Sequence, residues 1–174
     1  QMLDAVADSK GQPQALPMGI SLPVLLINRK QVPGAAKTID LAPRTWHDVQ
    51  DLAGTLADHG VKCPLTSSRF AWVHIENTAS QHGESLDIRT GRSEKVKANS
   101  LMNVKHLALL ASWEKSRYFT YFGPDAEANQ HFLRGECAMI TGESSLYAAA
   151  RAAGMDVSIA PLPFYDDAYG AQRD

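Results

Sequence analysis

Two short polar stretches contain the residue types that could do chemistry in this chain, and each follows an apolar run. In the first, Thr66, Ser67 and Ser68 come after residues 61–65 and before a segment whose apolar residues have helical spacing. Hydroxyls and free backbone N–H groups at the start of a helix favour an acceptor-rich or anionic ligand, and Trp72 in that helix offers an apolar wall with one donor. The alternative is that the hydroxyls only cap the helix and that Trp72 belongs to the core.

The second stretch is Gly142, Glu143, Ser144 and Ser145, between an apolar run and an alanine-rich segment. Its first three residues match the strand-to-helix turn that presents a nucleophilic serine in hydrolases, but the fifth position of that motif requires glycine and holds Leu146. The hydrolase motif therefore fails at its last residue. A hydrolase that uses Ser144 with a histidine such as His82 remains an alternative hypothesis.

Motifs for other chemistry are missing from the sequence. It contains no phosphate-binding G-x-x-x-x-G-K-[ST] loop, no dinucleotide-binding G-x-G-x-x-G and no carboxylates paired by a readable spacing. The six histidines include no H-x-x-x-H pair, so we expect them at the surface or as caps. Cys63 and Cys137 fit neither a C-x-x-C nor a metal-ligand pattern, which leaves a disulfide and two buried thiols both open. We therefore predict binding without catalysis, with no metal and no cofactor.

Composition excludes two large classes of protein. With 44% hydrophobic and 21% charged residues, the 174-residue chain has the balance of one globular domain, and no run approaches the length of a membrane span. With a net charge of −2, the chain as a whole lacks the excess positive charge typical of nucleic-acid-binding proteins. The basic run Arg89, Arg92, Lys95 and Lys97 is interrupted by Glu94, which favours a solvated loop. The chain opens at Gln1 without a signal-peptide pattern, so we expect either a removed leader or an excised piece.

The elements that position the two polar stretches alternate between strands and helices. Thr45, with Asp48 three residues later, begins a helix that ends before Gly60. Helical spacing recurs from Val104 to Trp113, and strand-like apolar runs occur at residues 22–28, 137–141 and 157–162. Further segments are an extended run at 14–20, an aromatic loop at 118–124, and helices at 126–133 and 146–153. This alternation predicts an α/β layered sheet whose ligands gather at the carboxyl ends of strands, where both polar stretches lie. The aromatic loop is either a hydrophobic plug or a ligand-facing wall.

Several local patterns then match, in the same order, those of a known family. The matching positions are Leu16, Pro17, Ser21, Pro23, Val24, Asn28, Pro43, Thr45, Trp46, Lys62, Cys63, Trp72, Glu76, Asn77, His82, Gly83, Val104, Lys105, His106, Leu109, Leu110, Phe119, Thr120, Tyr121, Gly123, Gly135, Cys137, Ala138 and Met139. Together they span nearly the whole chain. The sequence resembles the extracellular solute-binding proteins of bacterial ABC importers, in particular those for glycerol-3-phosphate.

The resemblance implies a periplasmic protein of two α/β lobes that holds its ligand in the cleft between them and remains monomeric when complete. This chain is similar to the middle portion: residues 1–20 correspond to a crossover between lobes, 21–162 to the second lobe and 163–174 to the start of a return crossover. The implied partners are a small-molecule ligand, glycerol-3-phosphate or a glycerophosphodiester, and the membrane permease subunits of the importer. A sugar receptor of the same transport family is the further alternative.

For the site, the resemblance implies a half-site made of Ser21, Trp72 and either Ser144 or Ser145 at a helix N-terminus suited to phosphate. The segment around Ser144 is one residue shorter than in the family, so both serines are candidates. The chain also departs from the family at position 69. The family has a second tryptophan there, three residues before the position of Trp72, and this chain has Arg69 instead. A guanidinium at this position suits bidentate contact with phosphate, so Arg69 joins the predicted site. The cysteines are placed on strands of one sheet, and export to an oxidising compartment permits a bridge.

Overall fold

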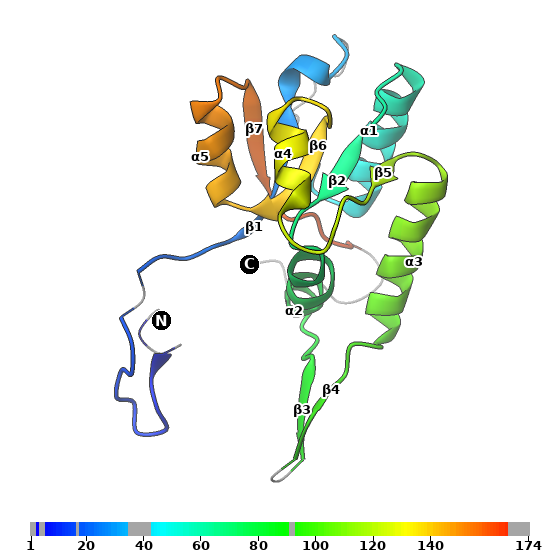
Figure 1. The fold of residues 1–174 in the computed structure, drawn as a ribbon. Coiled ribbons are helices and arrows are strands. Elements are labelled where there is room, and N and C mark those ends of the chain that lie inside the picture. The colour runs from blue at the N-terminus through cyan, green and yellow to red at the C-terminus, as the bar shows by residue number, and fades with distance from the viewer. Residues whose placement is uncertain (1–2, 4–5, 17, 35–42, 91–92, 167–174) are drawn as a thin grey trace.

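A five-stranded sheet organises the protein in the computed structural model, which describes residues 3, 6–16, 18–34, 43–90 and 93–166 (Figure 1). Its strands are β1 (Pro23–Asn28), β2 (Leu65–Ser67), β5 (Phe119–Thr120), β6 (Met139–Glu143) and β7 (Val157–Pro161), in the order β5-β2-β6-β1-β7. Strand β2 is parallel to β5 and β6, whereas β1 is antiparallel to both β6 and β7. The last residues of β5, β2, β6 and β7 therefore lie at one edge, which we call the carboxyl edge.

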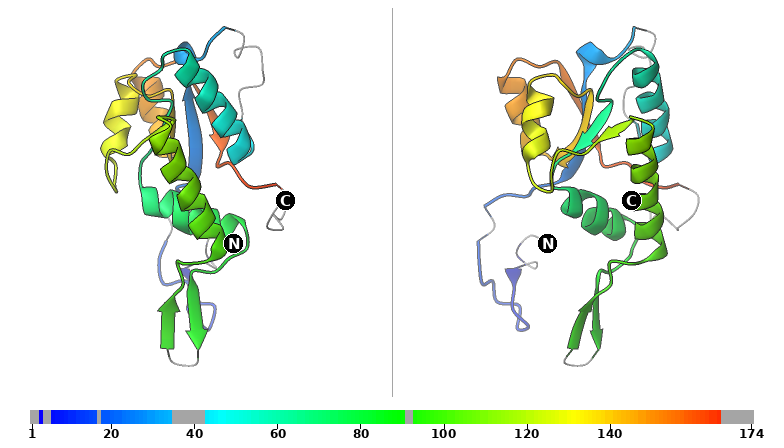
Figure 2. Two further views of the ribbon diagram at one scale, coloured as in Figure 1. Left: turned by 90° about the vertical axis from the view of Figure 1, so that its right-hand side faces the viewer. Right: turned by 45° about the vertical axis from the view of Figure 1, so that its right-hand side comes forward.

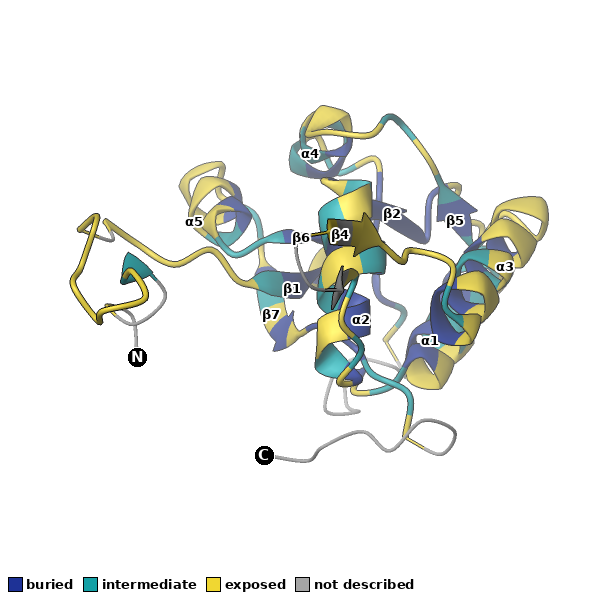
Figure 3. Ribbon diagram, turned by 90° about the horizontal axis from the view of Figure 1, so that it is seen from below, coloured by how far each residue is buried: buried dark blue, intermediate teal, exposed yellow. Residues whose placement is uncertain are grey.

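Helices cover both faces of this sheet, as the view from below shows (Figure 3). Helices α1 (Trp46–Asp58) and α3 (Leu101–Lys115) pack on one face, and α4 (Glu127–Leu133) and α5 (Ser145–Ala152) pack on the other. Side chains of β1 alternate between the two layers, with Leu25 facing the first core and Leu26 the second. Because both faces are buried, the run at 23–28 is almost wholly apolar instead of alternating. The predicted α/β class is confirmed.

Helix α1 forms where the capping pattern predicted it. The Thr45 hydroxyl accepts a hydrogen bond from the Asp48 N–H at 3.0 Å, and the Asp48 carboxylate accepts one from the Thr45 N–H at 2.9 Å. These two contacts satisfy donors that the first turn of a helix leaves free. Gly60 follows the helix with a φ of +83°, the left-handed conformation expected after a helix C-terminus.

Helix α3 is present as predicted, and part of its apolar series faces the core. Leu110 and Trp113 are buried together with Met102 and His106, whereas Val104 is 53% exposed. The inward face includes a histidine, which apolar spacing alone does not indicate. Both ring nitrogens of His106 have polar partners on other elements, and these hydrogen bonds offset the cost of burying the ring.

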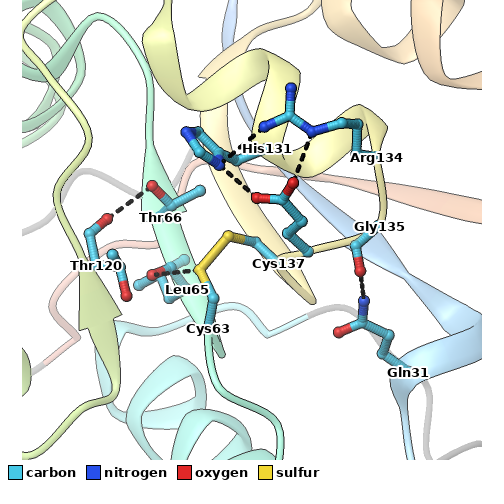
Figure 4. A network of polar contacts seen from close by, with 10 residues as sticks. Gln31, Cys63, Leu65, Thr66, Thr120, His131, Arg134, Gly135 and Cys137 are labelled. Atoms are coloured by element: carbon cyan, nitrogen blue, oxygen red, sulfur yellow. Dashed lines mark hydrogen bonds and ion pairs between the residues drawn. A yellow bond between two sulfur atoms is a disulfide. The ribbon is translucent and has the colours of Figure 1, made fainter.

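A disulfide joins Cys63 and Cys137 and resolves the alternative left open by the sequence (Figure 4). Each cysteine lies two residues before a strand, β2 and β6 respectively, and these strands are paired in parallel. The Ala138 N–H donates to the Cys63 carbonyl at 2.9 Å, so the pairing extends back to the bridge. The disulfide thus ties the amino ends of two central strands, opposite the carboxyl edge.

Two segments leave the body of the protein on the side of the carboxyl edge (Figures 1 and 2). They are the arm before β1 and the hairpin of β3 (Asp87–Thr90) and β4 (Ser93–Val96). The described segment after β7 stays packed on the body, with Leu162 buried and Phe164 paired with Thr45. The hairpin occupies the region predicted as a solvated loop, and the turn predicted at Gly91 lies outside the described residues. The described residues of the predicted extended run 14–20 form no strand, and Leu16 and Met18 are exposed. No helix in the described part of the chain is long and apolar enough to cross a membrane.

Candidate functional site

The corner after β2 is made by Arg69. Its φ is +50°, a conformation that few non-glycine residues adopt, and its N–H donates to the Asp125 carbonyl at 2.5 Å. The preceding Ser68 N–H donates to the Thr141 carbonyl at 2.9 Å, which continues the pairing with β6 by one residue. The chain therefore turns sharply at the carboxyl edge and leaves the Arg69 side chain half exposed there, at 50%.

The three hydroxyl residues before this corner neither cap the helix nor face solvent. Thr66, Ser67 and Ser68 are all at most 1% exposed, and the first two lie inside β2. The Thr66 hydroxyl donates to the Thr120 carbonyl at 2.8 Å, and the Ser67 hydroxyl donates to the Ser68 carbonyl at 3.3 Å. Both interpretations of this triplet are wrong, because the strand continues through Thr66 and Ser67, whose hydroxyls bond internal carbonyls, and Ser68 is buried as well.

The helix after the corner contains a π-helical turn, η4 (Trp72–Asn77), followed by α2 (Thr78–Gln81). The Asn77 amide donates to the Trp72 carbonyl at 2.8 Å, and the Thr78 hydroxyl donates to the Val73 carbonyl at 2.9 Å, each spanning five residues. Such π-turns are frequent at functional sites. Trp72 itself is half-buried and packs against the core under α1 and α3, so part of its ring belongs to the core.

At the end of β6, Ser144 is tied to the residue that follows Ser21. The Ser144 N–H donates to the Leu22 carbonyl at 2.8 Å, and the Leu22 N–H donates to the Ser144 hydroxyl at 3.3 Å. Arg69 joins the same edge, because its Nε lies 3.3 Å from the Glu143 Oε1. The structure therefore brings Ser21, Arg69 and Ser144 to one stretch of the carboxyl edge. Trp72 lies on the helix that starts from this corner, and Ser145 is exposed as the first residue of α5.

The Arg69–Glu143 ion pair sets the net charge of this stretch of the carboxyl edge. A guanidinium beside a carboxylate carries no net charge as a unit, and Glu143 is 30% exposed while Arg69 is 50% exposed. An anionic ligand must therefore compete with Glu143 for Arg69. Arg69 was predicted as a free guanidinium, and its carboxylate partner was not predicted from the sequence.

A cavity of about 550 Å³ adjoins this stretch, between the start of β1, the end of β7 and the helix of Trp72. Its lining includes Leu22, Asn77, Gln81, Ile159 and Pro161. None of the five predicted site residues lines the cavity, but it lies next to two of them, because Leu22 follows Ser21 and Asn77 bonds the Trp72 carbonyl. A second hollow of about 270 Å³ lies between α3 and the aromatic loop, where Tyr121 is 47% exposed and Phe119 is buried. The loop thus contributes both a plug and an exposed wall.

Three histidines are buried, and two of them differ from the expectation that histidines lie at the surface or in caps. His74 and His106 lie inside helices and are 0% exposed, whereas His82, which is 7% exposed, is the C-cap residue of α2 as the expectation allowed. The His82 Nδ1 contacts the Thr78 carbonyl at 2.8 Å, and its Nε2 accepts from the Tyr165 N–H at 3.1 Å. Both nitrogens of His82 are therefore occupied, which leaves no base on His82 for Ser144. His74 and His106 occupy positions that their helices turn inward, and apolar periodicity alone does not mark a histidine at such a position.

Burial also fixes the protonation of two of them. Burial, and then the neighbouring His106, lowers the pKa of His74 well below its usual value. Burial, and then His82, lowers the pKa of His106 to about 3. Both rings are therefore neutral at neutral pH. Among the described residues, no three His, Cys, Asp or Glu side chains are grouped so that they could hold a metal ion.

Comparison with known proteins gives a consistent match along the chain. Residues 1–172 match the family model described as bacterial extracellular solute-binding protein. The sn-glycerol-3-phosphate-binding periplasmic protein UgpB of Pectobacterium atrosepticum is 31% identical over 163 residues, covering 91% of this chain and 37% of that protein. UgpB of Escherichia coli K12 is 30% identical over 174 residues, covering 97% of this chain and 40% of that protein. UgpB of Yersinia pestis is 30% identical over 173 residues. The chain thus spans about two fifths of the length of these relatives.

Proposed function

The chain belongs to the family of bacterial extracellular solute-binding proteins, and from this premise we propose that it supplies one wall of a ligand cleft in the binding component of an ABC importer. Family membership and the periplasmic relatives place it in the periplasm, where its disulfide is stable. Its partners in this proposal are a small-molecule ligand and the membrane permease subunits. Residues 21–162 form the second lobe, and the segments on either side lead toward the other lobe.

The proposed ligand is glycerol-3-phosphate or a glycerophosphodiester. One observation carries this proposal: Ser21, Arg69 and Ser144 come from three separate segments and meet at one stretch of the carboxyl edge. Hydroxyls and a guanidinium are the groups that hold a phosphate, and Trp72 beside them suits the carbon skeleton. The adjoining cavity of about 550 Å³ falls within the range of small-ligand sites.

In this mechanism the other lobe closes over the edge and buries the ligand between two walls. Arg69 exchanges its contact with Glu143 for one with the phosphate, while the serine hydroxyls and Ser145 at the start of α5 contact the remaining oxygens. No bond is made or broken in the ligand. A single wall leaves much of the ligand in water, so the isolated chain is expected to bind far more weakly than the complete protein.

Calorimetric titration of glycerol-3-phosphate into the complete protein and into this chain tests the proposal. We expect Arg69→Ala to weaken binding by the complete protein by about 30-fold, the value of roughly 2 kcal/mol for a hydrogen bond to a charged group. Arg134→Ala is the matched control, because Arg134 also pairs with a carboxylate, that of Glu136, but precedes the amino end of β6 (Figure 4). Micromolar affinity in the isolated chain would contradict the half-site.

The Arg69–Glu143 pair also favours a second candidate, a receptor for a sugar or oligosaccharide, because a neutral ligand leaves that ion pair intact. The two candidates diverge for Glu143→Gln in the complete protein. If the ligand is a phosphate, this change frees Arg69 and strengthens binding severalfold. If the ligand is a neutral sugar, Arg69→Ala barely alters binding, and an oligosaccharide rather than a polyol phosphate produces heat on titration.

A further inference from the structure

A row of hydrogen-bonded side chains crosses the interior beneath the candidate site. The Thr141 hydroxyl lies 3.1 Å from the His74 Nε2, the His74 Nδ1 lies 2.9 Å from the His106 Nε2, and the His106 Nδ1 lies 2.6 Å from the Tyr165 hydroxyl. We call these four residues the histidine row. Thr141, His74 and His106 are all 0% exposed, so water does not supply alternative partners.

The histidine row satisfies all four ring nitrogens with neutral rings. A neutral imidazole has one donor and one acceptor, so each ring donates toward one neighbour and accepts from the other. The Trp46 ring packs against both histidines, with its centroid 4.8 Å from that of His106 and 5.5 Å from that of His74. If either ring were removed, the two groups that it now bonds, one on each side, would each keep a buried donor or acceptor without a partner.

The histidine row links two of the elements next to the proposed site with two that hold no predicted site residue. Thr141 lies on β6, two residues before Glu143, and His74 lies on the π-turn, two residues after Trp72. Tyr165 lies in the segment after β7, which borders the adjoining cavity at Leu162, and its N–H also donates to His82 at 3.1 Å. The other of these two elements, α3, supplies His106.

We propose that His74 and His106 are positioning residues that hold the helix of Trp72 and the segment after β7 in fixed register with the end of β6, a role that rests on the proposed function. Neither histidine contacts the ligand. A row that merely filled the core could end on any neighbour, whereas this one starts on β6, the strand that leads into Ser144, and ends on the segment after β7. Displacing the Thr141 end would shift β6 against the helix of Trp72.

Two substitutions of His106 separate the two halves of the row. The amide of asparagine reaches the position of Nδ1, so His106→Asn keeps the contact with Tyr165 and loses the one with His74. The amide of glutamine reaches the position of Nε2, so His106→Gln keeps the contact with His74 and loses the one with Tyr165. His47→Gln, at an exposed position on α1, is the matched control.

Hydrogen exchange in the ligand-free complete protein and affinity for glycerol-3-phosphate are measured for all variants. We expect exchange about tenfold faster at residues 73–78 in His106→Asn and about tenfold faster at 164–165 in His106→Gln, the value of roughly one hydrogen bond. Both variants should weaken ligand binding about fivefold or more, whereas His47→Gln changes neither quantity. If both variants loosen the same segments, or only α3, or leave affinity unchanged, the positioning role is wrong.

Failure of the proposed function gives a different result. In that case the wild-type protein binds neither polyol phosphates nor oligosaccharides. The exchange measurement uses no ligand, so it still decides whether the histidine row couples the two segments. Equal protection in all variants would then refute the coupling itself.

Discussion

Lowering the pH from 7 to 5 should reduce the free energy of unfolding of this chain by at least about 2 kcal/mol, because buried histidines resist protonation. The folded pKa of His106 is about 3, against the ordinary value of 6.5 expected after unfolding. Between these values the unfolded chain binds a proton at His106 that the folded chain does not. The contribution is therefore fully present above pH 6.5 and declines as the pH falls toward 3. At pH 5 the difference is roughly 1.5 pH units at 1.36 kcal/mol each, or about 2 kcal/mol.

His74 adds to this loss with the same sign, because burial and then His106 lower its pKa as well. The groups that face His106 are His74, His82, the Tyr165 hydroxyl and the Trp46 ring, and none of them is a carboxylate that could stabilise a cation. The pKa of Glu136 is lowered to about 2, first by Arg134 and then by His131, so its titration falls mainly below pH 5. The interval from pH 7 to 5 therefore reports chiefly on histidines.

Urea denaturation at pH 7, 6 and 5, at constant ionic strength, measures this loss. Replacing His106 with glutamine should make the dependence shallower, and His47→Gln should retain the dependence of the wild type. Ring-nitrogen chemical shifts of His74 and His106 provide a second readout that does not depend on a folded variant, since both rings should stay neutral at pH 5. A free energy of unfolding that changes by less than about 0.5 kcal/mol over this interval, or a His106 ring that titrates near pH 6.5, would refute the reasoning.

Three further predictions concern stability, each measured by urea denaturation. Reducing the Cys63–Cys137 disulfide, which links residues 74 apart, should lower the free energy of unfolding by about 4 kcal/mol on the chain-entropy model. The control is the same protein in buffer without reductant, whose free energy of unfolding should stay unchanged. Gly142→Ala should cost about 1–3 kcal/mol, because its new Cβ would lie 2.5 Å from the Ser68 hydroxyl; adding Ser68→Ala should recover most of that loss, and an equally unstable double variant would contradict the clash. Thr45→Ala should cost about 1 kcal/mol by removing the cap of α1, and an unchanged midpoint would show that packing alone sets the start of this helix.

Local patterns predicted the elements whose cause is local. The start of α1 depends on Thr45 and Asp48, which are three residues apart, so the sequence contains the whole interaction. The apolar run at 22–28 was predicted as an extended strand, and it forms β1 with Pro23 at its start. The order of the strands, by contrast, depends on which distant segments pair. The antiparallel placement of β1 between β6 and β7 has no local signal, and neither does the π-turn, in which the Asn77 and Thr78 side chains also bond carbonyls five residues earlier.

The candidate site shows the same division. Ser144 could be placed at the end of a strand from its own neighbours, but its pairing with Leu22 joins residues far apart in the chain. The hydroxyls of Thr66 to Ser68 were assigned to a corner because polar residues commonly end strands, but the structure buries all three residues and bonds the Thr66 hydroxyl to a carbonyl of the neighbouring strand β5. The histidine row escaped detection for a related reason. Each member looks polar and exposed by itself, and only the assembled fold supplies the partners that allow its burial.

The internal satisfaction of polar groups at the carboxyl edge constrains what a ligand must do there. Ser144 is already bonded to Leu22, and Arg69 is already paired with Glu143, so a ligand gains affinity only by offering better partners than these. A phosphate dianion is a stronger partner for a guanidinium than one carboxylate, and in the proposed mechanism closure of the other lobe removes the water that weakens the exchange. A neutral polyol cannot displace Glu143 and would have to bind around the intact ion pair. The class of ligand therefore turns on Glu143, a residue that neither the hydroxyl pattern nor the resemblance singled out.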